Sequence, residues 1–527
     1  MQKETDLNTQ KLTDFLKKHA RIIKAAVFAL LPLLCCIISC AMDGKTIAEV
    51  YLPASEWNDE LFYFKQVEGM VDFGYPKGYF GFNESHSRLF SYAAWSPVLV
   101  WPWLLWGLIF GWNLMSPIYC NIALMCLAVF LFVWFVKPDK KQLFMLALLF
   151  ASFTPFNRYT MSSMSESICF SMVIVVFALG VSYLEKEHAG KLAALFILTA
   201  VMTLMRPYLL VFMLLPIYLL IRKRKWVGSF ISLGVVAITG VAYGLIKYFF
   251  SAEYFAPLFK TEFLRAFATE GFFGGIRFTL SQLFIFGKQF FLMAYEGFKS
   301  GLPEGAYFGG FLVILVILLI QVCHNYRKKQ KKQLTMNLYL AVCFIAMSGA
   351  LLLMYKLFEG SRHLVTFMAV GIFAVSLMET RFYKKMIVLA AVFVYLYTYL
   401  GASYPHYYQV PYRTEALAEQ VSLWQTVYEE KLAFNEEAVP GYDNVVIWQI
   451  SDTVEGETVA LPWQLLYGLP SGYGISCCKA EYLIANYDEL ESRYLATIPG
   501  GEVDTLCQEK GAEQLFADAE MVLYRLR

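Results

Sequence analysis

Long apolar segments recur along most of this chain, and they constrain its fold more than any other feature of the sequence. Hydrophobic residues make up 58% of the 527 positions, and the mean hydropathy is +0.50. A run of about 20 apolar residues is long enough to cross a bilayer as a helix. The sequence therefore predicts an all-α polytopic membrane protein over most of its length.

Eleven apolar segments are predicted to be transmembrane helices. They are Ile22–Ala41, Ser116–Val136, Leu143–Phe156, Met164–Leu184, Leu192–Met205, Tyr208–Ile221, Val227–Phe250, Tyr307–Val322, Leu334–Leu357, Leu364–Met378 and Met386–Gly401. Pro97–Trp112 is excluded, because at ~1.5 Å per residue it reaches about 24 Å, short of a ~30 Å core. Its many tryptophans favour the headgroup boundary, so we expect an interfacial or re-entrant helix. The aromatic, amphipathic loop Ser251–Ala306 is expected to lie along the interface as well.

Charge is distributed very unevenly. With Pro97–Trp112 excluded, every strong basic cluster falls on one side of the membrane, which the positive-inside rule makes cytoplasmic. These clusters are the N-terminus, Lys137/Lys140/Lys141, Lys186/Lys191, Arg222–Lys225, Arg327–Lys332 and Arg381/Lys384/Lys385. From Arg413 to Arg527 there are 7 basic and 20 acidic residues, a net charge of −13, whereas the preceding part carries +15.

These charges predict the organisation of the chain in the cell (plasma) membrane. Residues 1–21 form a cytoplasmic N-terminus, residues 22–401 a transmembrane domain, and residues 402–527 a small extracytoplasmic domain. The transmembrane domain includes an outer loop at 43–115. No internal repeat, phosphate-binding glycine loop or nucleic-acid signature is visible, so a nucleic-acid partner is not expected.

The C-terminal segment has the pattern of a mixed α/β domain. Glu415–Leu432 is apolar at helical spacing, and three short runs are predicted to be strands: Asn444–Ile450, Glu481–Asn486 and Met521–Leu526. Cys477, Cys478 and Cys507 lie in this segment, where two of them could pair. Their spacing is not that of a metal site, and the sequence does not decide whether a disulfide forms.

An adjacent carboxylate pair, Asp59-Glu60, lies in the outer loop soon after the first span. A carboxylate close to the membrane is costly to keep without a partner or a function. One of the two is a candidate general base that removes a proton from an acceptor hydroxyl. The alternative is a solvated loop pair, or partners for Lys65 or Arg88.

Further along the same loop, Glu84 and His86 are candidates for binding a sugar or a metal. The more ordinary interpretation is a structural turn with a surface histidine. The use of a divalent metal is left open by the sequence, and no cofactor is required by it.

Ionisable residues also gather at the outer ends of later spans. They are Arg158, Glu166, Arg206, Glu359, Arg362 and His363. Guanidinium groups bind phosphate in bidentate fashion, so these arginines suit a phosphate attached to a lipid. The alternative is that Glu166, Arg206, Glu359 and Arg362 pair with one another.

Together these pieces resemble the polytopic GT-C glycosyltransferases, the group that includes protein O-mannosyltransferases and the aminoarabinose transferases of lipid A. The resemblance rests on the order of weak motifs over Ile22 to Gly401. They are Asp59-Glu60 after the first span, an interfacial helix ending in Phe110-Gly111, Pro155 to Tyr159 followed by Met164-Ser165-Glu166, Arg206-Pro207, and Glu359 to His363. Glu84-Ser85-His86 matches no motif of that group, and the C-terminal segment does not resemble an oligosaccharyltransferase domain.

The resemblance implies transfer of a sugar from a polyprenyl-phosphate-linked donor to an extracytoplasmic acceptor, which is a glycan, a lipid or a protein. Asp59 would then be the base and Glu60 an auxiliary, while Arg206 and Arg362, with Arg158 as a lesser candidate, would neutralise the leaving phosphate. Two other functions remain open, a flippase for lipid-linked sugars and a membrane-anchored assembly protein for envelope glycans. The ionisable residues lie at span ends rather than mid-span, which argues against a transport pathway.

Overall fold

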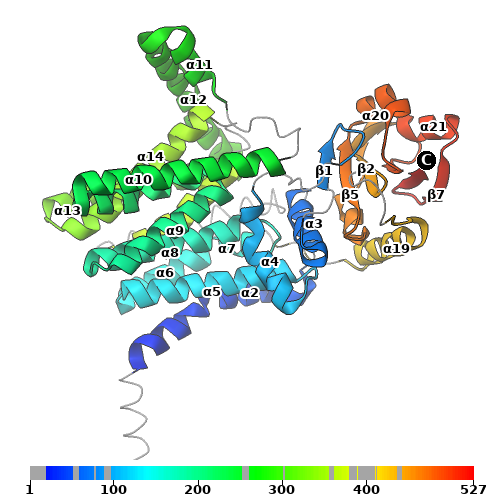
Figure 1. The fold of residues 1–527 in the computed structure, drawn as a ribbon. Coiled ribbons are helices and arrows are strands. Elements are labelled where there is room, and N and C mark those ends of the chain that lie inside the picture. Colours follow the sequence, from blue (N-terminus) through cyan, green and yellow to red (C-terminus); the bar gives the residue numbers. More distant parts are fainter. Residues whose placement is uncertain are drawn as a thin grey trace, which may run out of the picture.

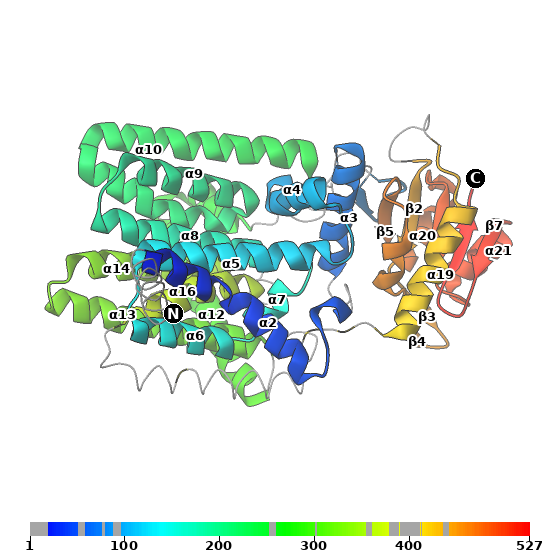
Figure 2. The ribbon, with the colours of Figure 1, turned by 90° about the horizontal axis from the view of Figure 1, so that it is seen from below.

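The computed structural model describes residues 19–50, 58–75, 79–87, 96–251, 260–300, 303–354, 361–378, 389, 410, 412, 414–435 and 442–527. A bundle of apolar helices is joined to a smaller C-terminal domain, which lies at one end of the bundle beyond helix α3 (Asn58–Phe73) (Figure 1). Figure 2 shows the same two parts from below. The predicted span Met386–Gly401, except Leu389, and the candidate residue Glu359 lie outside the described residues.

The other helices of the bundle follow the apolar segments of the sequence. They are α2 (Leu31–Met42), α4 (Trp101–Phe110), α5 (Ser116–Val136), α6 (Lys140–Ser152), α7 (Pro155–Thr160), α8 (Glu166–Glu185), α9 (Ala189–Met205), α10 (Leu214–Phe250), α11 (Glu262–Thr269), α12 (Gly271–Ser300), α13 (Pro303–Arg327), α14 (Lys331–Met354) and α16 (Leu364–Ser376). Short 3-10 helices lie between them: η1 (Ile47–Glu49), η2 (Pro97–Val100), η3 (Pro207–Met213) and η5 (Ser361–His363).

In the described part of the chain, 6 helices are long and apolar enough to cross a membrane. They are His19–Met42, Ser116–Val136, Glu166–Glu185, Pro207–Phe250, Tyr307–Arg327 and Lys331–Met354. Pro97–Phe110, Ala189–Met205 and Leu364–Ser376 are shorter apolar helices. The helical membrane architecture is confirmed, whereas the number of eleven spans, the domain boundaries and the sidedness of the termini stay predictions.

Three predicted spans differ locally from the helices observed. Leu143–Phe156 is not one helix, since α6 ends at Ser152 and α7 begins at Pro155. The proline ring cannot continue the preceding helix but is well suited to the first turn of the next one. The segments Tyr208–Ile221 and Val227–Phe250 form η3 and α10, which bends sharply at Lys225, where φ is +41°.

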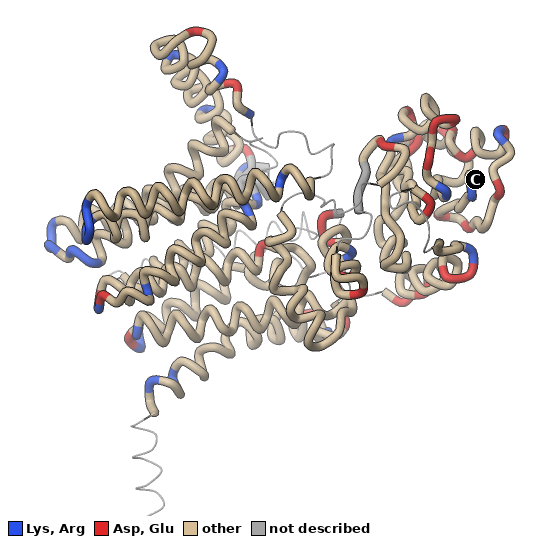
Figure 3. Tube along the Cα trace, viewed as in Figure 1, with Lys and Arg blue, Asp and Glu red and all other residues tan. Residues whose placement is uncertain are grey.

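Charged residues mark the two ends of the bundle. Figure 3 shows lysine and arginine gathered at the end that lies away from the C-terminal domain, including the bend of α10, whereas acidic residues are frequent on that domain. At this bend the backbones of the two halves of α10 come close together. A Cβ on Gly228, after the bend, would lie 2.6 Å from the backbone oxygen of Leu220, before it. This arrangement is the one that the positive-inside interpretation of the sequence expects.

The predicted interfacial loop Ser251–Ala306 contains a long helix. The 30 residues of α12 pack their C-terminal part against α13 and α14, where Phe290 and Phe308 meet edge to face at 4.6 Å between ring centroids. In Figure 1, α12 runs across the direction of α10 rather than along it. A helix that follows the membrane surface would have this orientation.

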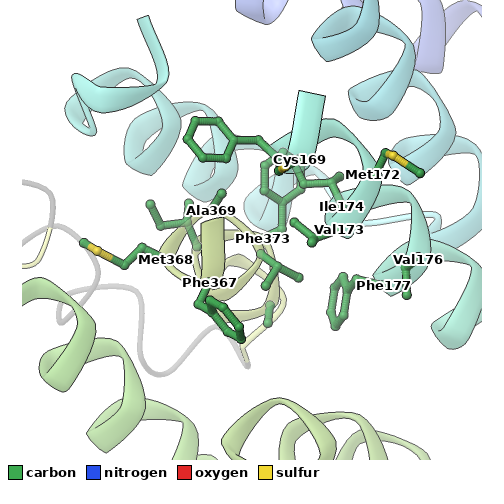
Figure 4. Close-up of a cluster of buried hydrophobic side chains, with 14 of the residues drawn as sticks. Cys169, Met172, Val173, Ile174, Val176, Phe177, Phe367, Met368, Ala369 and Phe373 are labelled. Carbon is green, nitrogen blue, oxygen red and sulfur yellow. The ribbon is translucent and has the colours of Figure 1, made fainter. Parts of the chain in front are cut away.

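The core of the bundle is built around α8, and 83% of the 18-residue apolar stretch of this helix is buried. Side chains of α8, such as Val173 and Phe177, lie beside Phe367 and Phe373 of α16 (Figure 4). Phe132 of α5 packs edge to face on Phe373 at 4.9 Å between centroids. Because α8 and α16 pack together, the polar residues at their N-terminal ends are held close to one another.

The C-terminal domain is a six-stranded sheet in the order β1-β5-β2-β6-β8-β7. Its strands are β1 (Tyr79–Phe82), β2 (Val445–Gln449), β5 (Gly474–Cys478), β6 (Tyr494–Thr497), β7 (Glu513–Ala517) and β8 (Val522–Arg525), and β3 (Ser451–Val454) with β4 (Glu457–Ala460) forms a separate hairpin. Helix α19 (Glu415–Lys431) packs on one face, and α20 (Ala480–Asn486) with α21 (Glu502–Glu509) packs on the other. Two further 3-10 helices are η7 (Trp463–Gly468) and η8 (Tyr487–Glu489).

The predicted helix and two of the three predicted strands of this domain are confirmed as α19, β2 and β8. The prediction of a strand at Glu481–Asn486 is wrong, because these residues belong to α20. Parallel strands need a crossover connection, and α20 supplies it between β5 and β6. Cys477, Cys478 and Cys507 are buried, and none of them forms a disulfide.

Strand β1 comes from the outer loop between the first span and α4, far from the rest of the domain in sequence. It pairs in parallel with β5, with Tyr79 opposite Ile475 and Phe82 opposite Cys477. The C-terminal domain is therefore completed by a segment of the loop that carries Asp59 and Glu60.

Candidate active site

Helix α3 places both carboxylates of the acidic pair in its first turn. Carboxylates are favoured there because the unpaired backbone N–H groups give the helix N-terminus a partial positive charge. Tyr63 and Val67 are buried in the core of the bundle, whereas Leu61 is buried in the cluster that includes the C-terminal domain. Glu60 is completely buried, while the side chain of Asp59 remains 20% exposed.

The C-terminal domain holds α3 from its other side. Lys65 is buried and donates hydrogen bonds to the backbone oxygens of Tyr467 and Leu469, and it pairs with Glu68 at 2.7 Å. Near the end of the helix, Ser471 donates to Asp72 at 2.6 Å. Helix α3 is thus fixed between the bundle and the C-terminal domain.

Three arginine–carboxylate pairs join α3, α7, α8, the end of α9 and η5. Arg362 lies 2.7 Å from Asp59, Arg158 lies 3.3 Å from Glu60, and Arg206 lies 2.9 Å from Glu166. The side chains of the Glu60–Arg158 and Glu166–Arg206 pairs have no exposed surface, whereas those of Asp59 and Arg362 are 20% and 26% exposed. All six residues were candidates from the sequence, and the structure brings them together.

The Glu60–Arg158 pair anchors α3 to the bundle. Ser163 donates to the backbone oxygen of Glu60 at 2.8 Å, which adds a second bond at the same place. The turn that contains Ser163 is fixed in turn by Asn121, which donates to the backbone oxygens of Thr160 and Ser162. A fully buried ion pair of this kind is a structural element, because separating it would leave a charge in an apolar surrounding.

Arg206 is the centre of a second set of buried polar contacts. Besides Glu166, its guanidinium contacts the Ser165 hydroxyl at 2.7 Å, the Tyr208 hydroxyl at 3.1 Å and Nδ1 of His363 at 3.1 Å. Arginine carries only donors, so Nδ1 of His363 must accept this hydrogen bond. Burial and the positive charges of Arg206 and Arg362 hold the pKa of His363 well below its usual range. His363 is therefore a neutral imidazole.

The neutral state of His363 gives a pH-dependent prediction. The pKa of His363 in the folded protein is lower than the value of about 6.5 in the unfolded chain. As the pH falls, the imidazole is therefore protonated in the unfolded chain before it is protonated in the folded protein. The contribution to stability should be constant above about pH 6.5 and should decrease as the pH falls below it. Comparing the thermal unfolding midpoint of the wild type and of His363→Gln from about pH 5 to 8 tests this, and parallel pH profiles would contradict it.

Asp59 and Arg362 form the accessible edge of the cluster. Burial would lower the pKa of Arg362, but Asp59 and Glu166 outweigh that effect and raise it, so the guanidinium remains charged. Nη2 of Arg362 donates to Asp59, whereas its Nε has no hydrogen-bond partner among the described residues. This Nε is a second donor of the guanidinium, and it is enclosed, with almost no accessible surface.

Tyr63 is a site residue that the sequence interpretation missed. It follows Asp59 by one helical turn and is 2% exposed, and its hydroxyl has no hydrogen-bond partner in the described part of the chain. Burial raises the pKa of Tyr63, and Asp59 raises it further against the opposing effect of Arg206 and Arg362. The i, i+4 spacing from Asp59 was the signal in the sequence that could have identified it.

Glu84 and His86 belong to a different part of the molecule. His86 stacks on Tyr442 at 4.7 Å between ring centroids and lies 3.5 Å from Glu491. The backbone oxygen of Ser85, between them, accepts from Ser492. These contacts attach the end of β1 to the C-terminal domain, and they match the structural turn rather than a shared site with Asp59. Among the described residues, no group of three or more His, Cys, Asp or Glu side chains could hold a metal ion.

No family model matches this sequence, and no curated protein matches it. Among solved structures, the crystal structure of the oligosaccharyltransferase from Archaeoglobus fulgidus in the apo form matches with a TM-score of 0.50 and 11% identity, over 92% of this chain and 70% of that chain. ArnT from Cupriavidus metallidurans bound to undecaprenyl phosphate matches with a TM-score of 0.42 and 10% identity, over 95% and 97% of the two chains. The fold is the GT-C fold, as the sequence resemblance implied.

Proposed function

We propose that this GT-C chain is a membrane glycosyltransferase that moves a sugar from a polyprenyl-phosphate-linked donor to an extracytoplasmic hydroxyl. The observation that carries the proposal is the Asp59–Arg362 pair at the accessible edge of a buried charge cluster. It combines a carboxylate that can accept a proton with a guanidinium that can bind a phosphate. The ArnT structure named above contains undecaprenyl phosphate, a lipid of the proposed donor class.

In the proposed reaction, the donor phosphate displaces Asp59 from Arg362. Nη2 and the unpartnered Nε of Arg362 then bind the phosphate, and Asp59 is released to face the acceptor. The acceptor hydroxyl gives its proton to Asp59 as its oxygen bonds to the anomeric carbon. The bond from that carbon to the phosphate oxygen breaks, and the lipid phosphate leaves with the electron pair and is stabilised by Arg362. Attack on the face opposite the phosphate would invert the anomeric configuration.

The other site residues support this exchange. Arg206 has no exposed surface and contacts Glu166, so we assign it to holding His363 next to Arg362 rather than to the first contact with phosphate. Glu60 and Arg158 hold α3 in place. Tyr63, one turn after Asp59 on α3, is assigned to orient the sugar through its hydroxyl.

The phosphate role of Arg362 predicts a loss of donor use when its side chain is removed. Arg362→Ala should weaken productive donor binding by roughly 2–5 kcal/mol, because a charged contact at a mostly buried site is lost. Arg362→Lys should recover only part of it, since a single ammonium cannot replace the planar fork. Steady-state kinetics in vesicles measure this, with the donor that the wild type uses best among a panel of radiolabelled polyprenyl-phospho-sugars.

Arg265→Ala is the matched control, because Arg265 is an exposed arginine on α11 outside the site. It should leave the kinetic constants for the donor unchanged. Wild-type kinetics in Arg362→Ala would remove Arg362 from the mechanism. If the wild type transfers no sugar from any member of the panel but moves the lipid across vesicles, the proposed function itself is wrong.

A further inference from the structure

A cavity lies at the opposite end of the bundle from Asp59, with a volume of about 530 Å³. It is lined by the C-terminal ends of α5, α8, α13 and α16 and by the N-terminal parts of α6 and α14, and it is partly open. Helix α8 begins at Glu166 in the charge cluster and ends at Glu185 in this cavity, about 30 Å away at ~1.5 Å per residue. The cavity is therefore separate from the proposed transfer site.

Three carboxamide side chains line the cavity and are more than nine-tenths buried. Gln321 and Asn325, one turn apart on α13, are 6% and 7% exposed, and Asn337 on α14 is 8% exposed. Nε2 of Gln321 is enclosed and has no hydrogen-bond partner among the described residues, whereas no polar side-chain atom of Asn325 or Asn337 is both enclosed and unpartnered. An enclosed amide normally has a partner, so Nε2 of Gln321, with two further amides lining the same space, points to a ligand that supplies one.

Neighbouring polar groups of the cavity are already used by the fold. Asp139 accepts from the backbone N–H groups of Lys141 and Gln142 and caps α6. Gln142 donates to the backbone oxygen of Leu377. The three carboxamides differ from these groups because they line the cavity without capping a helix.

The lining also indicates the chemistry of the ligand. A carboxamide both donates and accepts hydrogen bonds, which suits hydroxyl groups, and it has no charge to attract a phosphate. No arginine lines the cavity among the described residues, and the acidic Asp139 and Glu185 offset Lys332. An apolar wall that includes Phe177 and Met336 faces the amides. The volume lies within the range of about 300–1,000 Å³ typical of small-molecule sites.

We propose that this cavity binds a neutral, hydroxyl-rich group, such as the sugar headgroup of an uncharged glycolipid. Its hydroxyls pair with Gln321, Asn325 and Asn337, and its apolar side lies against Phe177 and Met336. The same chemistry is offered by a lipid headgroup from the bilayer or by a free sugar, and the experiment below separates these sources.

Thermal unfolding of the full-length chain in detergent, with added ligand, tests the proposal. The probes are monoglucosyl-diacylglycerol, free methyl glucoside, phosphatidylcholine and phosphatidic acid. We expect a dose-dependent rise of the unfolding midpoint with the glucolipid and none with either phospholipid, because a ligand that binds only the folded state stabilises it. An equal effect of methyl glucoside at the same concentration would identify a free sugar as the source.

Asn337→Leu and Asn325→Leu should each abolish the shift, and either variant suffices if the other does not fold. Without ligand, both should unfold at or above the wild-type temperature, because each replaces a mostly buried polar amide with an apolar side chain of similar size. Gln289→Leu on α12, an exposed glutamine outside the cavity, should keep the shift. Absence of a shift with both sugar probes, a shift of equal size with phosphatidic acid, or a shift that persists in both leucine variants would overturn the proposal. None of these outcomes depends on sugar transfer.

Discussion

Asp59→Asn is expected to reduce turnover by about 10²–10⁴-fold, the usual effect of removing a general base. The amide keeps the size of the carboxylate and can still accept a hydrogen bond from Arg362, so folding and donor binding should be preserved. The loss should therefore appear at saturating donor, in the maximal rate rather than in the apparent affinity. Single-turnover transfer of a radiolabelled sugar, together with a lipid-binding assay on the same protein, separates these two quantities.

Glu49→Gln is a matched control for the change at Asp59. Glu49 is also an outer-loop carboxylate paired with a cation, Lys45, but both side chains are 40% or more exposed. The control should retain the wild-type rate. Near-normal turnover of Asp59→Asn with saturating donor would show that Asp59 is not the base.

The second large effect is expected at the Glu60–Arg158 pair and concerns stability. Glu60→Gln should lower the free energy of unfolding by about 3–5 kcal/mol, because it leaves the Arg158 charge buried without its counter-charge. Arg158→Met should have a similar cost, because it leaves the Glu60 charge buried without its counter-charge. The double variant Glu60→Met with Arg158→Met should recover most of the loss, since well-packed apolar side chains can replace a buried ion pair.

A double-mutant cycle based on reversible unfolding in mixed micelles measures these changes. If the two single losses simply add in the double variant, the pair is not coupled and α3 is held by other contacts. Turnover per folded molecule in the double variant is a further measurement. It should remain close to that of the wild type if Glu60 only positions α3, and it should fall if Glu60 touches the substrate.

Much of the bundle could be predicted because lipid imposes a simple rule on the sequence. A segment such as Ser116–Val136 has to be a helix, since its backbone groups have no water to bond with. All six members of the three ion pairs were recognised as candidates because ionisable residues are rare near apolar segments.

The specific contacts could not be predicted, because they depend on how helices distant in the sequence rotate and pack. The order of residues does not reveal that Arg158 faces Glu60 while Arg362 faces Asp59. Tyr63 was missed because a buried tyrosine on an apolar helix face looks like an ordinary core residue. The helix α20 was mistaken for a strand because Tyr482, Leu483 and Ile484 form a short apolar run, whose length does not distinguish the two structures.

Strand β1 has a consequence for how the chain is made. Tyr79–Phe82 emerges from the ribosome before all but the first span, whereas its partner β5 begins only at Gly474. A nascent chain thus carries an unpaired strand edge until β5 has been synthesised, and such edges are prone to pair wrongly. Closure of the sheet then draws the loop and α3 to the C-terminal domain. The contacts of Lys65 and Asp72 with that domain, which help to hold Asp59 in place, can therefore form only after Tyr467, Leu469 and Ser471 have been made.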